Sequence, residues 1–348
     1  MGERLKKAIH NFGYTRIIII LFLAMLIISA VMLKLQMKNI VNGMLVRTGM
    51  NGLLTLAMVP SIQSGTGLNF GLPIGILCGL VGAVTSIAID LSGIKAFFIA
   101  NIIGIALALV AGYVYGVILN RVKGQEMLIG TYAGFSVVSG MCMFWIFAPL
   151  RSPKMIWPYG GRGLRVTISL EGIFDKILNN WLSKKILGVD VPFGLLLYVV
   201  AFCVLIWLFS RSKTGIAMQA AGGNPVFAEA SGINIDKMRI VGTVLSTVLG
   251  AMGILVYAQS YGFLQLYTAP LFMAFPAVAA ILIGGASIND ATITHVIIGT
   301  FLFQSLLVVA QPVANQILPE GNLSEAVRII ISNGIILYAL TRIGGGEQ

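Results

Sequence analysis

Long apolar stretches separated by short polar connections dominate the pattern along this chain. Ten of them are long enough to cross a bilayer as a helix, which takes roughly 17–25 mostly apolar residues: 17–33, 44–62, 69–89, 94–119, 127–148, 192–210, 239–260, 271–288, 292–311 and 326–341. The pattern predicts an all-α polytopic membrane protein of about ten transmembrane helices, folded as a single transmembrane domain over residues 1–348.

Polar and helix-breaking residues interrupt the second and third stretches. Pro60, Gly65, Gly67, Gly71 and Pro73 frame the sequence SIQSGTGLNFG, which is too polar to face lipid. Non-helical backbone at membrane depth is tolerated only where protein or a water-filled cavity surrounds it. We therefore expect residues 60–73 to form a broken or re-entrant element in the interior of the protein.

The composition agrees with this prediction and narrows the class of protein. Hydrophobic residues make up 57% of the 348 residues and charged residues only 10%, whereas soluble domains are about 25% charged. The net charge of +11 does not indicate nucleic-acid binding, because the basic residues lie mainly in short connections, where they anchor helix ends. The three cysteines lie inside apolar stretches and lack metal-ligand spacing.

The basic residues also predict an orientation. They precede the stretch 17–33, which we expect to be a retained transmembrane helix because it is long for a signal peptide. A cytoplasmic N-terminus then places the C-terminus and the loop 211–238 in the cytoplasm too. The loop 149–191 becomes external, and its apolar spacing predicts one or two helices between residues 169 and 187.

No combination of residues predicts catalysis or a metal site. The chain has 12 acidic residues and two histidines, and the closest acidic pairs lie in segments expected to be external and solvated, Glu171 with Asp175 and Glu320 with Glu325. The phosphate-binding pattern G-x-x-x-x-G-K-S/T is absent from the sequence. We therefore expect a non-catalytic chain without a cofactor of its own, and any ATP and Mg²⁺ would be bound by another subunit.

Ion-coupled transport is the alternative from a different class. Secondary carriers usually place ionisable residues at membrane depth, and the central parts of the predicted spans have almost none. Asp90 lies at the end of a span, and Arg47 and Arg328 lie within about one turn of an end. This distribution weighs against proton or sodium coupling.

Neutral polar residues inside the predicted spans have two interpretations. Most are expected to form hydrogen bonds between helices, worth about 0.6–2 kcal/mol each. Gln63, Thr66 and Asn69 differ because they cluster in the broken element. At these positions, lining a path for a neutral polar solute is as good an interpretation as hydrogen bonding between helices.

The loop 214–238 is the most distinctive segment of the chain. Asn224 followed by Pro225 is typical of a helix start, with a side-chain cap and then proline at the first helical position. Gly232, seven residues later, is a natural residue for the end of that helix. A short helical run, GIAMQAA, and a Gly-Gly hinge precede it.

This order of elements favours a docking element that transmits motion from a partner. Phe227 and Ala228 offer a compact apolar face, and Glu229 adds a single charge. An ordinary cytoplasmic loop that carries a short amphipathic helix is the alternative.

Three stretches resemble the ribose/galactoside-type permeases of bacterial ABC importers. TGIAMQAAGGNPVFAEASGINIDK is similar to a family pattern that reads T-x-x-G-x-x-x-x-A-x-G-x-N-x-x-A-A-x-x-S-G-I-N-V. QSGTGLNFGLPIG at 63–75 and FPAVAAILIGGASI at 275–288 are similar to two further glycine-rich segments of that family.

The resemblance implies an inner-membrane permease of about ten helices that works as a dimer of identical or different permease subunits. It also implies two cytoplasmic ATPase subunits and an external solute-binding protein. The capped helix and its surroundings would form the ATPase-coupling element, with Asn224, Pro225, Phe227, Ala228, Glu229, Ser231, Gly232 and Ile233. The residues near the translocation path would be Gln63, Thr66, Asn69 and Phe70. The binding protein would dock on the basic loop 149–191 through Arg162 and Arg165, since such receptors need complementary charge at the rim.

The sequence departs from the sugar permeases in two places. Residues 288–291, Ile-Asn-Asp-Ala, stand where those permeases usually continue with glycines and an arginine. The early segment lacks an acidic residue common in sugar members, and TGLNFG leans towards the nucleoside and amino-acid branches. We expect a small neutral polar solute, with a simple sugar first and a nucleoside or branched-chain amino acid as the alternative.

Overall fold

The computed structural model describes residues 14–149, 152–156, 163–186, 188–317, 329–330, 333–337 and 341. The first half contains the helices α2 (Tyr14–Met32), α3 (Met37–Leu56), α4 (Met58–Gln63), α5 (Leu72–Ala88), α6 (Gly93–Arg121) and α7 (Glu126–Phe147). The second half contains α8 (Ile177–Asn180), α9 (Phe193–Ser210), α10 (Lys213–Gly223), α11 (Pro225–Ala230), α12 (Ile235–Tyr261), α13 (Ala269–Phe272), α14 (Ala274–Ile283) and α15 (Ile293–Ile317). Short strands complete it: β1 (Thr167–Ser169), β2 (Lys184–Ile186), β3 (Val189–Val191) and β4 (Phe263–Gln265).

This architecture confirms the prediction of an all-α polytopic membrane protein. Five of the described helices, α6, α7, α9, α12 and α15, are long and apolar enough to span a membrane, and shorter apolar helices accompany them. Every predicted span up to residue 311 coincides with a helix or a pair of helices. The last span, 326–341, falls largely outside the described residues.

Several predicted boundaries are wrong. α3 begins at Met37, seven residues before the predicted start at 44, because the polar residues of its first turns hide it from a hydropathy pattern. One of them, Asn42, donates its side-chain amide to the carbonyl oxygen of Asp190 at 2.7 Å. α14 ends at Ile283, and the GGASIND sequence that follows is a turn and not the end of a span.

Helix α12 forms the centre of the bundle and packs against α3, α5 and α6. Close approach depends on glycine, because a side chain at Gly75 would overlap the carbonyl oxygen of Thr247, and one at Gly79 would overlap that of Ala251. Small residues at such contacts let helices pack in an apolar environment that supplies no hydrophobic driving force.

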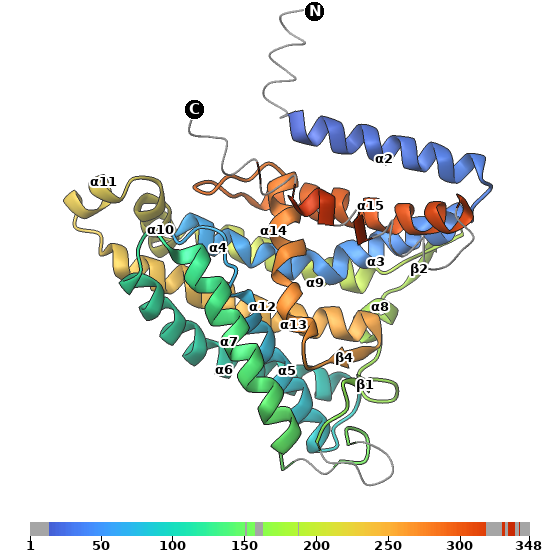
Figure 1. Ribbon diagram of the computed structural model, residues 1–348, viewed down its shortest axis with the longest axis horizontal. Helices are drawn as coiled ribbons and strands as arrows, with labels where there is room; N and C mark the ends of the chain where they lie inside the picture. Colours follow the sequence, from blue (N-terminus) through green and yellow to red (C-terminus); the bar gives the residue numbers. More distant parts are fainter. Residues whose placement is uncertain are drawn as a thin grey trace, which may run out of the picture.

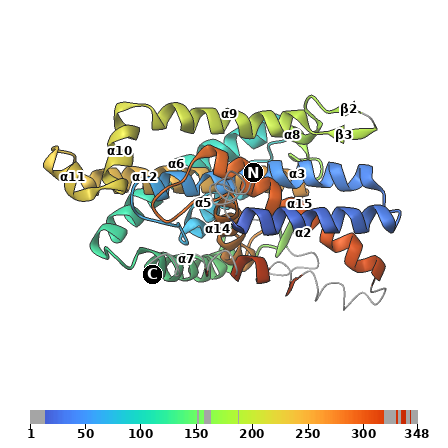
Figure 2. The same ribbon diagram turned by 90° about the horizontal axis from the view of Figure 1, so that it is seen from above.

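The bundle has two distinct ends (Figure 1). We call the end that carries α10 and α11 the coupling end, and the end that carries α8 and the four strands the loop end. Figure 2 shows the same opposition from above, with α11 at one extreme and β2 and β3 at the other. At the loop end β1 pairs antiparallel with β4, and Asp90 forms an ion pair with Lys154.

The prediction of one or two helices between residues 169 and 187 is confirmed only by one short helix, α8. Only α8 is helical there, and turns occupy residues 171–176. The apolar residues that suggested a helical stripe are instead buried in the main core, among them Ile173, Phe174 and Leu178. Apolar spacing could not distinguish these two outcomes, because a compact irregular loop buries its apolar side chains as well.

Candidate functional site

The start of α11 is built as its sequence predicts. The Oδ1 atom of Asn224 accepts a hydrogen bond from the backbone N–H of Phe227 at 3.0 Å, and Pro225 occupies the first turn. The cap satisfies one of the N–H groups that a helix start leaves unpaired. This part of the predicted docking element is confirmed as local structure.

The other end of α11 is closed by a Schellman motif. Gly232 has φ of +79°, and its N–H donates to the carbonyl oxygen of Glu229. The N–H of Ile233 donates to the carbonyl oxygen of Ala228, and the hydroxyl of Ser231 donates to that of Phe227. Because both ends are fixed by hydrogen bonds, this six-residue helix can transmit force as a rigid piece.

The side chains of α11 point in two directions. Ala228 is fully buried and packs with Met218 and Met238 in a small core of the coupling loop. Val226 and Phe227 are 79% and 66% exposed, and Glu229 is exposed beside them. The exposed apolar face therefore consists of Val226 and Phe227, and not of Phe227 with Ala228 as the sequence suggested.

Helix α10 rests directly on the broken element. A Cβ at Gly222 would overlap the carbonyl oxygen of Gln63 and lie 2.8 Å from the backbone nitrogen of Gly65. The Gly-Gly pair at 222–223 is thus the last turn of α10 and not a hinge. Only a residue without a side chain permits this contact, which joins the coupling loop to the broken element by backbone alone.

The side chain of Gln63 also joins the broken element to the coupling loop. Its Nε2 donates to the carbonyl oxygen of Ala291 at 2.9 Å, and its Oε1 accepts from the hydroxyl of Ser210 at 3.3 Å. Ser210 ends α9, and Ala291 follows the GGASIND turn. A single side chain of the broken element therefore contacts both the start of the coupling loop and the second break in the bundle.

Thr66 and Asn69 are buried and satisfied by other protein groups. Thr66 Oγ1 donates to the carbonyl oxygen of Ser61 at 2.8 Å. Asn69 donates to Ser246 Oγ at 2.8 Å and accepts from the hydroxyl of Tyr115 at 3.2 Å. These bonds hold the broken element between α6 and α12.

Phe70 completes this segment. Its ring lies 5.7 Å from that of Phe275, centroid to centroid, and the contact joins the broken element to α14. Of the four residues that the resemblance assigns to the path, Gln63, Asn69 and Phe70 thus brace the broken element against its neighbours, and Thr66 forms hydrogen bonds within it.

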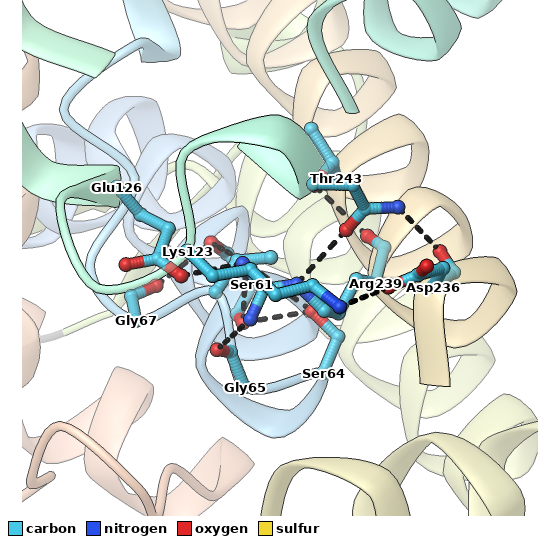
Figure 3. A network of polar contacts seen from close by, with 11 residues as sticks. Ser61, Ser64, Gly65, Gly67, Lys123, Glu126, Asp236, Arg239 and Thr243 are labelled. Carbon is cyan, nitrogen blue, oxygen red and sulfur yellow. Dashed lines mark hydrogen bonds and ion pairs between the residues drawn. The ribbon is translucent and has the colours of Figure 1, made fainter. Parts of the chain in front are cut away.

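Arg239 organises the polar network of the coupling end (Figure 3). It is almost fully buried at 8% exposure, and its Nε donates to Asn120 Oδ1 at 2.9 Å. Its Nη1 donates to the carbonyl oxygen of Gly65 at 3.1 Å, and its Nη2 forms an ion pair with Glu126. One guanidinium therefore ties α12 to the broken element and to both sides of the α6–α7 turn.

A second ion pair supports this arrangement from the surface. Lys123 pairs with Asp236 at 2.6 Å, and both side chains are more than half exposed. Asn120 also donates to the backbone carbonyl oxygen of Asp236 at 2.9 Å. The start of α12 is therefore attached to the α6–α7 turn by the buried contacts of Arg239 and by the exposed Lys123–Asp236 pair.

A cavity of about 520 Å³ opens beside this network. It lies between the broken element, the α6–α7 turn and the GGASIND turn, and Thr66, Glu126, Met127, Ile288 and Asn289 are among its lining residues. Of the four residues assigned to the path, Thr66 lines this cavity.

The loop end holds Arg165, one of the two residues expected to receive a binding protein. Arg162 lies outside the described residues. Arg165 is half-buried, and its Nε donates to the carbonyl oxygen of Ile156 at 2.6 Å. That hydrogen bond fixes the position of the guanidinium on the surface of the loop.

Sequence reasoning missed the Arg239 network. It assigned no particular role to Arg239, Glu126 or Asn120. The sequence held little signal for it, because Arg239 is the first residue of the predicted span 239–260 and follows the charged residues Asp236 and Lys237. The partner could not be identified, since more than a hundred residues separate Glu126 from Arg239.

The bundle of membrane-spanning helices, the broken element and the capped loop helix at one end define a class of protein, the multi-pass transport permeases. The chain matches the family model described as "Branched-chain amino acid transport system / permease component" over residues 9–340, so it belongs to that family. It is accordingly a multi-pass protein of the bacterial cytoplasmic (inner) membrane.

Curated relatives are similar over part of their length. The "Autoinducer 2 import system permease protein LsrC" of Yersinia pestis (strain Pestoides F) is 28% identical over 190 residues, 52% of this chain and 51% of that protein. The "Probable ABC transporter permease protein YphD" of Escherichia coli (strain K12) is 29% identical over 130 residues, 37% of this chain and 38% of that protein. The chain spans about half the length of the LsrC relatives that it matches. No solved structure matches it.

Proposed function

We propose that this chain is the permease subunit of an ABC importer that carries a small neutral polar solute, a simple sugar, into the cytoplasm. Membership of a permease family and the similarity to LsrC and YphD support a place in an importer of this kind. The whole chain, residues 1–348, would act as one permease domain, with its termini and coupling loop 211–238 in the cytoplasm.

The observation that carries the proposal is the exposed face of a rigid helix mounted on the broken element. Val226, Phe227 and Glu229 project from α11, whose two ends are fixed by hydrogen bonds. α10, which precedes it, contacts the broken element through Gly222. An exposed apolar patch is typical of a partner site, and aromatic residues are often its energetic centre.

The mechanism follows from this mounting. ATP and Mg²⁺ would bind to two cytoplasmic ATPase subunits, and their closure would push α11 and α10. The backbone of α10 contacts the broken element directly, so no flexible side chain lies between them to absorb the displacement. The displacement would therefore reach Gln63, Thr66, Asn69 and Phe70. A loaded solute-binding protein would dock on the loop end beside Arg162 and Arg165, and a second permease subunit would complete the path.

Shortening the exposed face of α11 tests this function. Phe227→Ala and Glu229→Ala should uncouple ATP hydrolysis from uptake of radiolabelled D-ribose or D-galactose in cells that contain the complete system. Truncation of a residue at the centre of an interface costs at least about 2 kcal/mol, or roughly thirtyfold in affinity for the ATPase subunit.

Ile216→Ala is the matched control, since this residue is an exposed apolar side chain on the neighbouring helix α10, at 58% exposure. The control should bind the ATPase and transport normally. Full uptake in the Phe227→Ala and Glu229→Ala variants would count against the proposed function.

A further inference from the structure

Helix α3 differs from the other long helices in its polarity. It is 20 residues long, yet it is not one of the five helices that are apolar enough to span a membrane by composition. It packs against α9, α12, α14 and α15. Lys38 and Asn39 of its first turn are exposed, whereas Arg47, Asn51 and Thr55 are half-buried or buried, where each unpaired group has a cost in free energy.

Arg47 lies in the middle of α3, ten residues after Met37 and nine before Leu56. At a rise of 1.5 Å per residue, it is about 15 Å from the start of the helix, roughly half of a hydrocarbon core that is about 30 Å thick. The expectation that Arg47 lies near the end of a span is therefore wrong, because the helix begins earlier than its hydropathy indicates. Charged residues at such a depth usually have a function.

Asn51 and Thr55 follow Arg47 at intervals of four, so the three residues lie on one face of α3. Asn51 and Thr55 line a narrow crevice with Gln304, which lies near the middle of α15, and with Pro276 and Ala277 of α14. The crevice has no room for a water molecule in this conformation.

Several polar groups on this face lack a partner. Among the residues that the structure describes, neither the guanidinium of Arg47 nor the side-chain amide of Gln304 has a hydrogen bond or ion pair. Asn51 uses only its Nδ2, which donates to the carbonyl oxygen of Arg47 at 2.9 Å. On α15, the buried hydroxyls of Thr300 and Ser305 are likewise unpaired within the described part of the chain.

We propose that Arg47, Asn51, Thr55 and Gln304 form the solute-contacting face of the translocation path, and that Arg47 determines its charge selectivity. The proposal rests on the proposed transport function. The positively charged guanidinium offers five N–H donors to solute oxygen atoms. Its field repels cations in a medium of low dielectric constant. The path accepts oxygen-rich solutes that are neutral or anionic, and it rejects cationic ones.

Thiol chemistry tests this face while cells take up radiolabelled D-ribose or D-galactose. Cys78, Cys142 and Cys203 are free and are first replaced by alanine. Asn51→Cys and Thr55→Cys are then treated with an anionic and a cationic methanethiosulfonate of similar size, in cells that express the complete system with its partners. Leu53→Cys is the matched control, because Leu53 is fully buried on another face of α3.

The two test variants should react during transport, and the Leu53→Cys control should not. The anionic reagent should react about tenfold faster than the cationic one at Asn51→Cys, about one helical turn from the charge of Arg47, and with a smaller preference at Thr55→Cys, about two turns away. Adding Arg47→Gln should abolish this preference, whereas Arg47→Lys should keep it. Absence of reaction in both test variants during active uptake, or a preference unchanged by Arg47→Gln, overturns the proposal.

The experiment also separates this proposal from the proposed function. If uptake proceeds without an ATPase partner while the labelling pattern is as expected, the path along α3 stands and only the ABC mechanism fails. If uptake requires the ATPase and the test variants remain unlabelled, the importer stands and the path lies elsewhere.

Discussion

At the scale of single residues, Arg239 makes the most consequential contacts of the coupling end. Its guanidinium has three different partners, Asn120, Gly65 and Glu126, in a nearly buried position. Removing one partner of a buried ion pair destabilises a protein far more than replacing both partners by apolar residues, because it leaves the other charge buried without a countercharge. The network therefore favours one relative position of the broken element and α12 over others.

Glu126→Gln should destabilise the protein by about 3–5 kcal/mol, because it leaves Arg239 buried without a countercharge. Replacing both partners, with Glu126→Leu and Arg239→Met, should recover much of this loss, since an apolar pair has no charge to desolvate. The free energy of unfolding in mixed detergent micelles measures both effects. Lys123→Met is the control, because the exposed pair with Asp236 contributes at most about 1 kcal/mol. An equal loss in the single and double variants would contradict this account.

At the scale of elements, the coupling loop and the broken element are one unit. Gly222 brings the two backbones into contact, and Gln63 adds side-chain contacts to α9 and to the GGASIND turn. Displacement of α10 must therefore displace residues 63–65 as well. The contact explains how a surface helix can act on residues in the interior.

Gly222→Ala should impair uptake even though alanine is the better helix former by about 1 kcal/mol. The added methyl group would overlap the carbonyl oxygen of Gln63, so α10 and the broken element would have to separate. Gly223→Ala is a closely matched control, because nothing lies within 4 Å of its Cβ position. That variant gains the same helix propensity and should transport normally. Equal uptake in the two variants would show that the contact does not transmit motion.

Local features of these elements could be predicted from the sequence, whereas contacts between distant segments could not. The cap at Asn224 and the left-handed Gly232 depend on neighbouring residues only, so their pattern predicts their structure. The orientation of Ala228 and the role of Gly222 depend on what lies opposite them in space. Arg47 was misplaced for a related reason, because a hydropathy pattern detects apolar residues and misses a helix that faces protein.

At the scale of the whole molecule, the two ends of the bundle are suited to different partners. The coupling end presents the exposed apolar side chains of α11, and the loop end presents a compact cap in which β1 pairs with β4. α12 runs between them and carries Arg239 near one end and Gln259 near the other. Gln259 accepts from the backbone N–H of Leu178 at 3.1 Å, so the loop end is attached to the same helix.

Because α12 connects the two ends, we predict that ATP hydrolysis at the coupling end drives uptake. An ion gradient should not be able to replace it. Purified with its partners and reconstituted in vesicles, the protein should take up radiolabelled D-ribose or D-galactose only when ATP is present on the side of α11. Replacing the phosphate-loop lysine of the co-purified ATPase should abolish uptake, because that lysine binds the β- and γ-phosphates. Proton or sodium gradients alone should produce none, since the central parts of the predicted spans have almost no ionisable residues. Uptake driven by such a gradient in vesicles without the ATPase would instead establish the ion-coupled carrier.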